Sequence, residues 1–356
     1  MQYLKLGPVK IPCKVKNANG KKYVELCGVK LPFSTELKNG EKVYKIFFLE
    51  CRLPFLDKIF FAHNYSNYQA RNEMSEEKQK EFLSDLFYEK VGYRPDFDNP
   101  KTMNEKIFWM KLNWHDPLIT KCCDKFCVKD YVTEVIGEEY IVPTIASWEK
   151  AEDIDFSVLP DKFVLKVNWS SGYNIIVRDK SRLNEENVRK KIDGWMLPHQ
   201  NSYYKAYNWG YKNMKPVVYA EKYIEQMDGQ VYDYKFLTSY GKVKMIMIAT
   251  NRGLGDMTKD FFDIDFNHLP FTSGTGLHAD PQPEKPKNYE KMIELAEKLA
   301  KPFPFVRVDF YEIGDKIYVG EMTFYPGGGL LPVRPMEWEY KYGDMFPIPD
   351  KKWGEE

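Results

Sequence analysis

The sequence has no excess of charge of either sign and no long apolar run. Its 52 basic and 52 acidic residues cancel. Nonspecific binding of nucleic acid depends on surplus Lys and Arg that release counterions, so this balance argues against a nucleic-acid partner. No run of about 18 apolar residues is present, and the opening MQYLKLGPVKIPCKVKNANG lacks the apolar core of a signal peptide. We therefore expect a cytoplasmic protein without a transmembrane segment.

Cysteine is scarce, and its spacing does not predict a metal site. The six cysteines are Cys13, Cys27, Cys51, Cys122, Cys123 and Cys127. The last three fall in ITKCCDKFCVKDYV, which helical spacing predicts to be one helix. No second Cys or His cluster stands at a zinc-like spacing, so reduced thiols are favoured over a zinc site. The chain also lacks a strand followed by GxGxxG, which excludes a Rossmann-type opening.

What the sequence does contain is a mixture of helical and strand patterns, which predicts an α+β fold. Residues 1–70 are expected to be a small β-rich segment with hairpins at NANGKK and LKNGEK, whose role the sequence does not indicate. Residues 75–140 carry helical spacing. Residues 141–225 and 226–356 are expected to form two strand-rich subdomains, each interrupted by a helix.

The segment DKFVLKVNWSSGYNIIVRD places a lysine inside an apolar run. Phe163–Val167 and Tyr173–Val177 are predicted to be the two strands of a hairpin, with Lys166 in the first. A buried ammonium without a partner is costly, so Lys166 either reaches water on an edge strand or faces an anion. The Ser-Ser-Gly turn at 170–172 is flexible enough to close over a phosphate. On this segment alone the two alternatives are evenly balanced.

The segment FVRVDFYEIGDKIYVGEMTFYPGGG predicts a second hairpin, in which two acids oppose each other. A three-residue GDK loop would set Asp309 opposite Glu321, with both carboxylates on one face. The same register sets Arg307 opposite Thr323. Two opposed acids repel unless a cation lies between them, and their hard oxygen ligands suit Mg²⁺. A register slipped by one residue would instead place the acids on opposite faces.

A third segment, PVVYAEKYIEQMDG, carries an apolar strand into EKYIE. An extended segment that leaves a sheet can offer backbone N–H and C=O groups to the edge of an adenine, while apolar neighbours hold the faces of the ring. Alone, this pattern is weak. The order of the three segments is far more specific than any one of them: a lysine in a strand, then an adenine-like hinge, then an Asp/Glu hairpin beyond an amphipathic helix.

With these segments the chain resembles the ATP-grasp enzymes, and most closely the TupA-like branch named for teichuronic acid biosynthesis. The similarity covers roughly Tyr93 to Pro335 and includes PKTMNEKIFWMKLN and CDKFCVKDYV beside the three segments above. It implies an ATP-grasp fold, in which two α+β subdomains grip ATP. Residues 141–225 would be the small lid-like subdomain with the phosphate loop. Residues 226–356 would be the C-terminal subdomain with the metal site.

The resemblance also implies roles for single residues. Those assigned to ATP are Lys125, Lys166, Ser170, Ser171, Gly172, Glu221, Lys222, Tyr223, Ile224 and Lys235. Those assigned to Mg²⁺ are Asp309, Glu321 and Thr323, where Thr323 replaces the Asn that is usual in the family. Arg307 would stabilise the transferred phosphoryl group. Arg252 and His278 bracket a loop that could face the substrate carboxylate, and a surface arginine and a loop histidine are the equal alternative.

The activity that the resemblance implies is that of an ATP-dependent carboxylate–amine ligase, which forms an amide through an acyl-phosphate. A role in surface or capsular polysaccharide synthesis would make the substrates a sugar acid such as a uronate, free or nucleotide-linked, and a small amine. Polysaccharide-assembly enzymes or a larger parent polypeptide would be its protein partners. Three alternatives stay open: a glycosyltransferase using the DxD of Asp263 and Asp265, a sugar phosphotransferase, and a binding module with an inactive ATP-grasp core.

Overall fold

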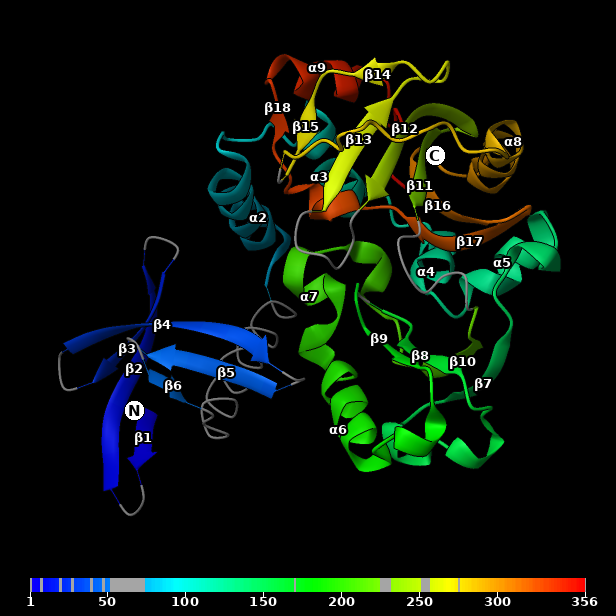
Figure 1. The fold of residues 1–356 in the computed structure, drawn as a ribbon. Coiled ribbons are helices and arrows are strands. Elements are labelled where there is room, and N and C mark those ends of the chain that lie inside the picture. Colours follow the sequence, from blue (N-terminus) through cyan, green and yellow to red (C-terminus); the bar gives the residue numbers. More distant parts are fainter. Residues whose placement is uncertain are drawn as a thin grey trace. The chain divides into compact units, whose positions relative to one another are not determined.

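The computed structural model divides into two compact units, Met1–Met74 and Ser75–Glu356 (Figure 1). Within the first it describes the backbone of six strands between residues 2 and 51. Beyond these strands the described residues are 74–169, 171–224, 232–250, 257–274 and 276–355.

The N-terminal unit is an antiparallel meander in which each strand pairs with the next along the chain. Its strands are β1 (Gln2–Leu6), β2 (Val9–Ala18), β3 (Lys21–Leu26), β4 (Val29–Lys38), β5 (Glu41–Ile46) and β6 (Leu49–Cys51). The expected hairpin-rich segment is thus confirmed. The sequence VKIP at 9–12 recurs as VKLP at 29–32, and an Asn-Gly pair follows each copy. The hairpins β2–β3 and β4–β5 are therefore two copies of one pattern.

Several helices of the second unit begin at a residue whose side chain caps the first turn. α2 (Glu76–Val91) starts after Ser75, whose hydroxyl accepts a backbone N–H, and ends at a left-handed glycine. α3 (Met103–Asn113) starts with a capping box between Thr102 and Glu105. The other α-helices are α4 (Pro117–Cys123), α5 (Val128–Val135), α6 (Glu185–Trp195), α7 (Ser202–Ala206), α8 (Tyr289–Ala300) and α9 (Glu337–Asp344).

The prediction of a single helix through ITKCCDKFCVKDYV was wrong, because the helix breaks into α4 and α5. Asp124 ends α4: its carboxylate accepts two backbone N–H groups of the following turn, at 2.8 and 3.0 Å, and the side-chain amide of Asn168 at 2.7 Å. The Lys125 N–H donates to the backbone carbonyl of Asn168, at 3.0 Å. The break therefore anchors Lys125 beside the small sheet.

The small sheet has the strand order β7–β10–β8–β9, and all its pairs are antiparallel. The strands are β7 (Thr144–Trp148), β8 (Phe163–Val167), β9 (Asn174–Val177) and β10 (Val218–Lys222). β8 and β9 form the predicted hairpin, with Lys166 opposite Asn174. On its other side Lys166 lies opposite Tyr219. Because β8 has a neighbour on both sides, the edge-strand interpretation of Lys166 is excluded.

The large sheet has the order β14–β13–β12–β11–β16–β17 and is antiparallel throughout. Its strands are β11 (Asp233–Ser239), β12 (Lys242–Thr250), β13 (Thr258–Phe262), β14 (His268–Leu269), β16 (Val306–Ile313) and β17 (Lys316–Thr323). A separate pair joins β15 (Thr272–Ser273) to β18 (Val333–Arg334). α8 packs against β11, β12 and β16 (Figure 1), where Tyr289 contacts the ring of Phe236 at a centroid distance of 6.0 Å.

The β16–β17 hairpin has the predicted pairing with a different loop. Asp309 lies opposite Glu321 and Arg307 lies opposite Thr323, as predicted. The loop, however, holds two residues rather than three. A bulge at Gly320 inserts one extra residue into β17 and restores the register. The two deviations cancel, so all four side chains still lie on one face.

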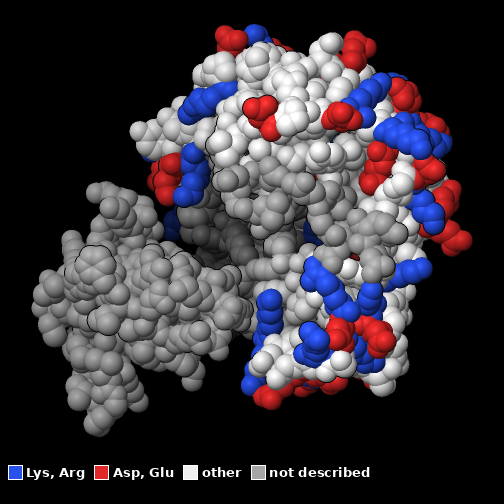
Figure 2. All heavy atoms as spheres, viewed as in Figure 1, with Lys and Arg blue, Asp and Glu red and all other residues white. Residues whose placement is uncertain are grey.

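One apolar core runs through both sheets of the second unit, with Phe163 and Leu165 from the small sheet and Phe236, Ile246 and Val308 from the large one. On the face shown in Figure 2, the acidic and basic side chains of this unit are interspersed. Among the residues for which a structure is given, no helix combines the length and apolarity needed to cross a bilayer.

Candidate active site

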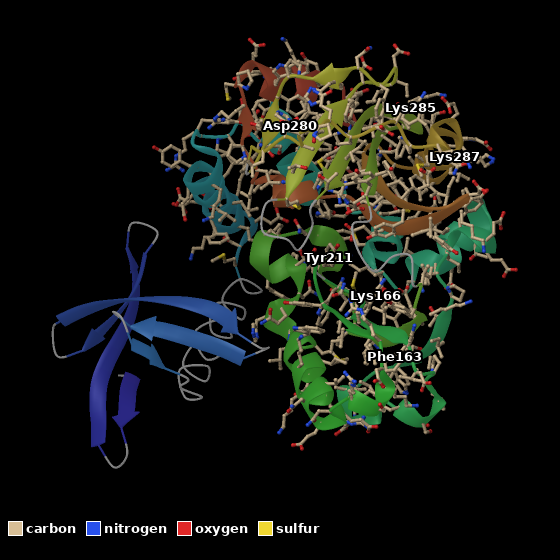
Figure 3. The ribbon with its side chains drawn as sticks, viewed as in Figure 1. Phe163, Lys166, Tyr211, Asp280, Lys285 and Lys287 are labelled. Atoms are coloured by element: carbon tan, nitrogen blue, oxygen red, sulfur yellow. The ribbon has the colours of Figure 1, made fainter. Side chains whose placement is uncertain are left out.

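A cavity of about 380 Å³ lies between the large sheet, α3 and the turn at residues 325–328. This volume is in the range of small-molecule sites. Figure 3 labels Tyr211, one of the residues that line the cavity, between the small and large sheets. The sequence-predicted residues that line it are Lys125, Ser171, Lys235, Arg307, Glu321 and Thr323. The structure therefore brings together residues that are far apart in the chain.

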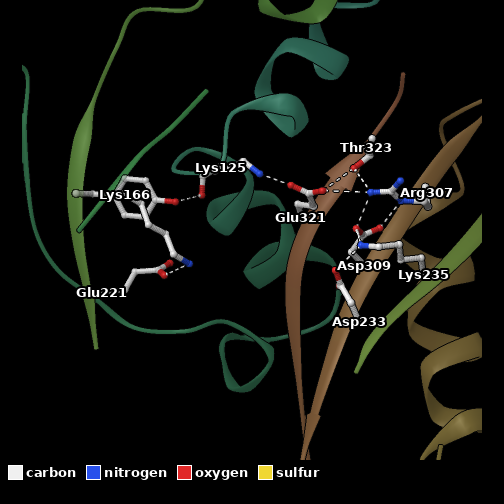
Figure 4. A network of polar contacts seen from close by, with 10 residues as sticks. Lys125, Lys166, Glu221, Asp233, Lys235, Arg307, Asp309, Glu321 and Thr323 are labelled. Atoms are coloured by element: carbon white, nitrogen blue, oxygen red, sulfur yellow. Dashed lines mark hydrogen bonds and ion pairs between the residues drawn. The ribbon is translucent and has the colours of Figure 1, made fainter. Parts of the chain in front are cut away.

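Arg307 is the centre of a charged cluster on the cavity face of β16 and β17 (Figure 4). Its Nε and Nη2 atoms donate to the two carboxylate oxygens of Asp309, at 2.6 and 2.7 Å. Nη2 also donates to Glu321 Oε1 at 3.2 Å and to Thr323 Oγ1 at 3.0 Å. The guanidinium, whose bidentate geometry suits a carboxylate, therefore offsets part of the repulsion between the two opposed acids.

Two lysines complete the charged cluster. Lys235 in β11 lies opposite Asp309 and pairs with both Asp309 and Asp233, the latter at 2.7 Å. Lys125, in the turn between α4 and α5, pairs with Glu321. Three cations thus meet three carboxylates in one site, so the charges balance locally even though most of these side chains are buried.

Burial and charge act in opposite directions on the two opposed acids. Burial raises the pKa of Asp309 and outweighs the effect of the neighbouring Arg307 and Lys235. Burial also opposes ionisation of Glu321, but the surrounding cations, Lys125 first among them, hold the pKa of this carboxyl well below its usual range. The Glu321 carboxyl is therefore held in its ionised form.

Lys166 is absent from the cavity lining and pairs with Glu221 at the end of β10 (Figure 4). The buried Glu221 carboxylate also lies 2.5 Å from Lys129 Nζ. Burial alone would raise the pKa of Glu221, yet the two lysines lower it. The other predicted hinge residues follow Glu221 directly: Lys222, Tyr223 and Ile224. The predicted phosphate lysine and the predicted hinge acid are therefore paired with each other.

The remaining predicted residues lie elsewhere. Ser170 and Arg252 fall outside the described residues. Gly172 has a left-handed φ of 80° in the turn beside Ser171. His278 does not line the cavity, and its Nδ1 lies 3.0 Å from Asp260 Oδ1.

The DxD motif has a local structural role. The Oδ1 atom of Asp263 accepts the backbone N–H groups of Asp265 and Asn267, at 3.0 and 2.8 Å. Asp263 therefore caps a turn. This arrangement gives the glycosyltransferase alternative no support.

Sequence reasoning missed Lys259 of β13, which lines the cavity and is half-buried. Its Nζ donates to the Ser273 carbonyl at 3.4 Å, and among the described residues no carboxylate lies within ion-pair distance of it. Burial lowers the pKa of Lys259, and the neighbouring Arg307 and Lys235 lower it further. A lysine inside the apolar-flanked strand TKDFF was the available signal, the same one that identified Lys166.

Sequence reasoning also missed Lys111, a wholly buried lysine in α3. Its Nζ donates to the carbonyls of Ala206 and Gly328, at 2.7 and 2.6 Å. Gly328 belongs to the glycine-rich turn that lines the cavity. Lys111 therefore fixes this turn against α3 and α7. Burial lowers its pKa well below the usual range.

Comparisons with known proteins agree with the predicted family. The model of the family described as TupA-like ATPgrasp matches residues 105–347. A search of curated proteins found no match.

Similar solved structures include the D-alanine–D-alanine ligase of Bacillus anthracis complexed with ATP, with 19% identity and a TM-score of 0.36 over 57% of this chain and 55% of that one. The D-alanine–D-alanine ligase of Helicobacter pylori has 13% identity and a TM-score of 0.36, over 64% and 61%. The ATP-grasp ligase PsnB complexed with a phosphomimetic variant of its minimal precursor, Mg and ADP has 8% identity and a TM-score of 0.37, over 88% and 85%. The chain thus spans little more than half the length of the B. anthracis ligase. Because the family match covers more than half of the chain, this protein belongs to the TupA-like ATP-grasp family and has the ATP-grasp fold.

Proposed function

We propose that this chain is an ATP-dependent ligase that joins a carboxylate to an amine and releases ADP and phosphate. The observation that carries the proposal is the charged cluster in the cavity, where Arg307 bridges Asp309 and Glu321. Phosphoryl transfer needs charge neutralisation and positioning more than covalent chemistry from the protein. A preorganised set of fixed cations around ionised oxygens meets that need, and membership of the ATP-grasp family supports ATP as the donor.

The donor set fits Mg²⁺. The Asp309 and Glu321 carboxylates and the Thr323 hydroxyl lie on one face, and Thr323 Oγ1 is 3.1 Å from Glu321 Oε1. Oxygen ligands of this kind are those that Mg²⁺ prefers. These three residues would hold the ion, which would supply charge neutralisation at the phosphates. Lys125, now paired with Glu321, would then be available to a phosphate.

The proposed reaction has two steps. An oxygen of the substrate carboxylate forms a bond to the γ-phosphorus of ATP, while the bond from that phosphorus to the ADP oxygen breaks. The amine then attacks the acyl carbon and loses a proton, and phosphate departs with one original carboxylate oxygen. Arg307 and Lys235, which both line the cavity, would offset the charge that develops on the transferred group.

Lys259 suits the substrate carboxylate, because its ammonium faces the cavity and no described acid pairs with it. Arg252 stays a prediction for the same role. For the substrates we propose a sugar acid such as a uronate, free or nucleotide-linked, and a small amine, in surface polysaccharide synthesis. The name of the family is the support for this choice.

The test combines trapping and isotope transfer. With ATP, Mg²⁺ and a panel of uronates labelled with oxygen-18 in the carboxylate, hydroxylamine should yield a hydroxamate together with ADP, and the label should appear in the released phosphate. Arg307→Gln should abolish both products, whereas Arg182→Gln, whose side chain is 86% exposed, should not.

Three other results would contradict the proposal. Release of AMP and pyrophosphate would show that ATP is cleaved between its α- and β-phosphates. A sugar phosphate without any amide, or glycosyl transfer without label in phosphate, would assign the protein to one of the alternative activities.

A further inference from the structure

Three side chains with metal-ligating atoms meet on the other face of the large sheet. Asp260 stands in β13 between Lys259 and Phe261, which both line the cavity, so strand alternation directs Asp260 to the opposite face. His268 comes from β14, the next strand. His278 comes from the segment after β15, which joins the edge of β13 through the backbone bond from the Lys259 N–H to Leu277.

The distances between the three candidate ligand atoms are close to those between ligands of one metal ion. His268 Nε2 and His278 Nδ1 lie 3.1 and 3.0 Å from the same oxygen, Oδ1 of Asp260. All three atoms lie within 4.8 Å of one another. A tetrahedral ion with bonds of about 2.0–2.1 Å separates its ligands by roughly 3.3 Å. A small adjustment of the two rings would therefore admit an ion.

The surroundings hold the carboxylate in place. Asp260 Oδ2 accepts the backbone N–H of Ala279 at 3.0 Å. The ring of His268 meets the edge of Phe262 at a centroid distance of 5.3 Å. Outer contacts of this kind orient the ligands of known metal sites.

The charge at this site is not balanced by a lysine or an arginine. Asp260 is wholly buried, yet within the described part of the chain its ion-pair partners are only the two histidines. Neutral imidazoles donate hydrogen bonds but no charge, and a buried carboxylate is costly without a compensating cation. This contrasts with Asp309, which Arg307 and Lys235 neutralise. A divalent cation would supply what is missing.

We propose that Asp260, His268 and His278 bind one divalent transition-metal ion of the Zn²⁺ type, which ties together β13, β14 and the segment around His278. Two imidazole nitrogens select such ions over Mg²⁺, which prefers oxygen. In each neutral imidazole the proton on the nitrogen that faces Asp260 moves, by exchange with water, to the other ring nitrogen, so the ligating nitrogen offers its lone pair and the histidine stays neutral. His278 is exposed, so water can fill the fourth position. This site is independent of the proposed ligase site on the other face.

Cobalt is a suitable probe because its visible absorbance reports nitrogen ligation. The metal-stripped full chain, titrated with Co²⁺ in excess Mg²⁺, should bind one equivalent and unfold at a higher temperature. His268→Asn and His278→Asn should each weaken binding at least about tenfold, since even outer-shell changes cost 10–100-fold. His199→Asn, a half-buried histidine elsewhere, and Glu321→Gln, in the oxygen-ligand site, should leave Co²⁺ binding unchanged.

A second measurement uses the unaltered chain and does not depend on the folding of variants. Diethyl pyrocarbonate modification, mapped by mass spectrometry, should fall at His278 when Zn²⁺ is added and stay the same at His199. The proposal would be overturned if the unaltered chain did not bind Co²⁺, or if both histidine variants bound Co²⁺ as tightly as the unaltered chain. Equal modification of His278 with and without Zn²⁺ would also overturn it.

Discussion

Each of the two lysines predicted to reach a nucleotide phosphate has a carboxylate partner: Lys166 pairs with Glu221, and Lys125 pairs with Glu321. Such a pair keeps a long, flexible ammonium at the site. It also lets a phosphate, which carries more charge, compete for the same lysine. The two lysines that hold Glu221 differ in burial, since the side chain of Lys166 is 31% exposed and that of Lys129 is 13% exposed.

This difference separates a binding role from a structural one. Lys166→Ala should lower ATP affinity about tenfold or more, the scale of a lost charge-assisted contact, and change the melting temperature little. Lys129→Ala should mainly lower the melting temperature, because Lys129 also donates to Val142 O and Thr144 Oγ1, both at 2.8 Å. Calorimetric titration with ATP and thermal melts of both variants check this. Unchanged ATP affinity and turnover in Lys166→Ala would make that lysine structural.

The charge of Asp309 can be tested without metal. From the sequence, removing one of two opposed acids should relieve repulsion and leave stability equal or improved. In the structure Arg307 and Lys235 flank Asp309, so Asp309→Asn leaves buried cations uncompensated. We therefore expect the free energy of unfolding in urea to fall by about 3–5 kcal/mol. Asp315→Asn, in the exposed hairpin loop, should leave it nearly unchanged. A more stable Asp309→Asn would mean that repulsion dominates after all.

Lys111 should give stability a dependence on pH. Burial lowers its folded pKa well below 10.5, so between that lowered pKa and 10.5 the unfolded chain binds more protons than the folded chain. Stability contributed by this group therefore rises with pH across that window. Lys111→Met should reduce the slope of the unfolding free energy by up to about 1.4 kcal/mol per pH unit. Urea unfolding at a series of pH values, with the exposed Lys341→Met as control, measures it. An unaltered slope would contradict the assignment.

At the scale of elements, local rules predicted most of the fold. Helical spacing predicted helices from residue 75 onward, and the structure shows that the first two start at the side-chain caps of Ser75 and Thr102. Strand alternation placed Asp309 and Glu321 on one face. The features that the sequence did not predict depend on contacts between residues far apart in the chain. The break at Asp124 depends on Asn168, which lies in another subdomain and has no signature near the break. The pairing of Lys166 with Glu221 likewise depends on the strand order of the small sheet.

The bulge at Gly320 is the element that no local pattern predicted. The hairpin register was correct only because a shorter loop and the bulge compensate. A Cβ at position 320 would lie 2.6 Å from the ring of Tyr311, so only glycine fits there. The bulge is thus a condition for the alignment of Glu321 with Asp309.

Gly320→Ala should therefore lower the unfolding free energy by about 1–3 kcal/mol, the usual cost of overpacking, and weaken the dependence of activity on Mg²⁺. Gly194→Ala in α6 is a matched control, because a Cβ there meets nothing within 4 Å and alanine favours helix. Denaturant unfolding and Mg²⁺ titration of both variants provide the test. Adding Tyr311→Ala to Gly320→Ala should restore part of the stability, and no recovery would show that the ring is not the obstacle.

At the scale of the whole molecule, the second unit contains every described residue of the cavity, and its core is shared between the small and large sheets. A shared core couples the two subdomains, so they should unfold together in one transition. The N-terminal meander is a separate compact unit.

A chain of residues 75–356 should accordingly keep the nucleotide site. We expect it to unfold in a single transition, at the temperature of the corresponding transition in the full chain. Adding Mg²⁺ and ATP should raise that temperature equally in both chains, because ligand stabilisation depends on the site alone. Differential scanning calorimetry of both chains, with and without Mg²⁺ and ATP, measures the two transitions. Lys235→Ala removes a cation from the cavity, so this variant of the shortened chain should not show the rise. A shortened chain that folds with the same transition but loses the nucleotide-dependent rise would show that the meander completes the site, and would assign residues 1–74 a direct role in binding.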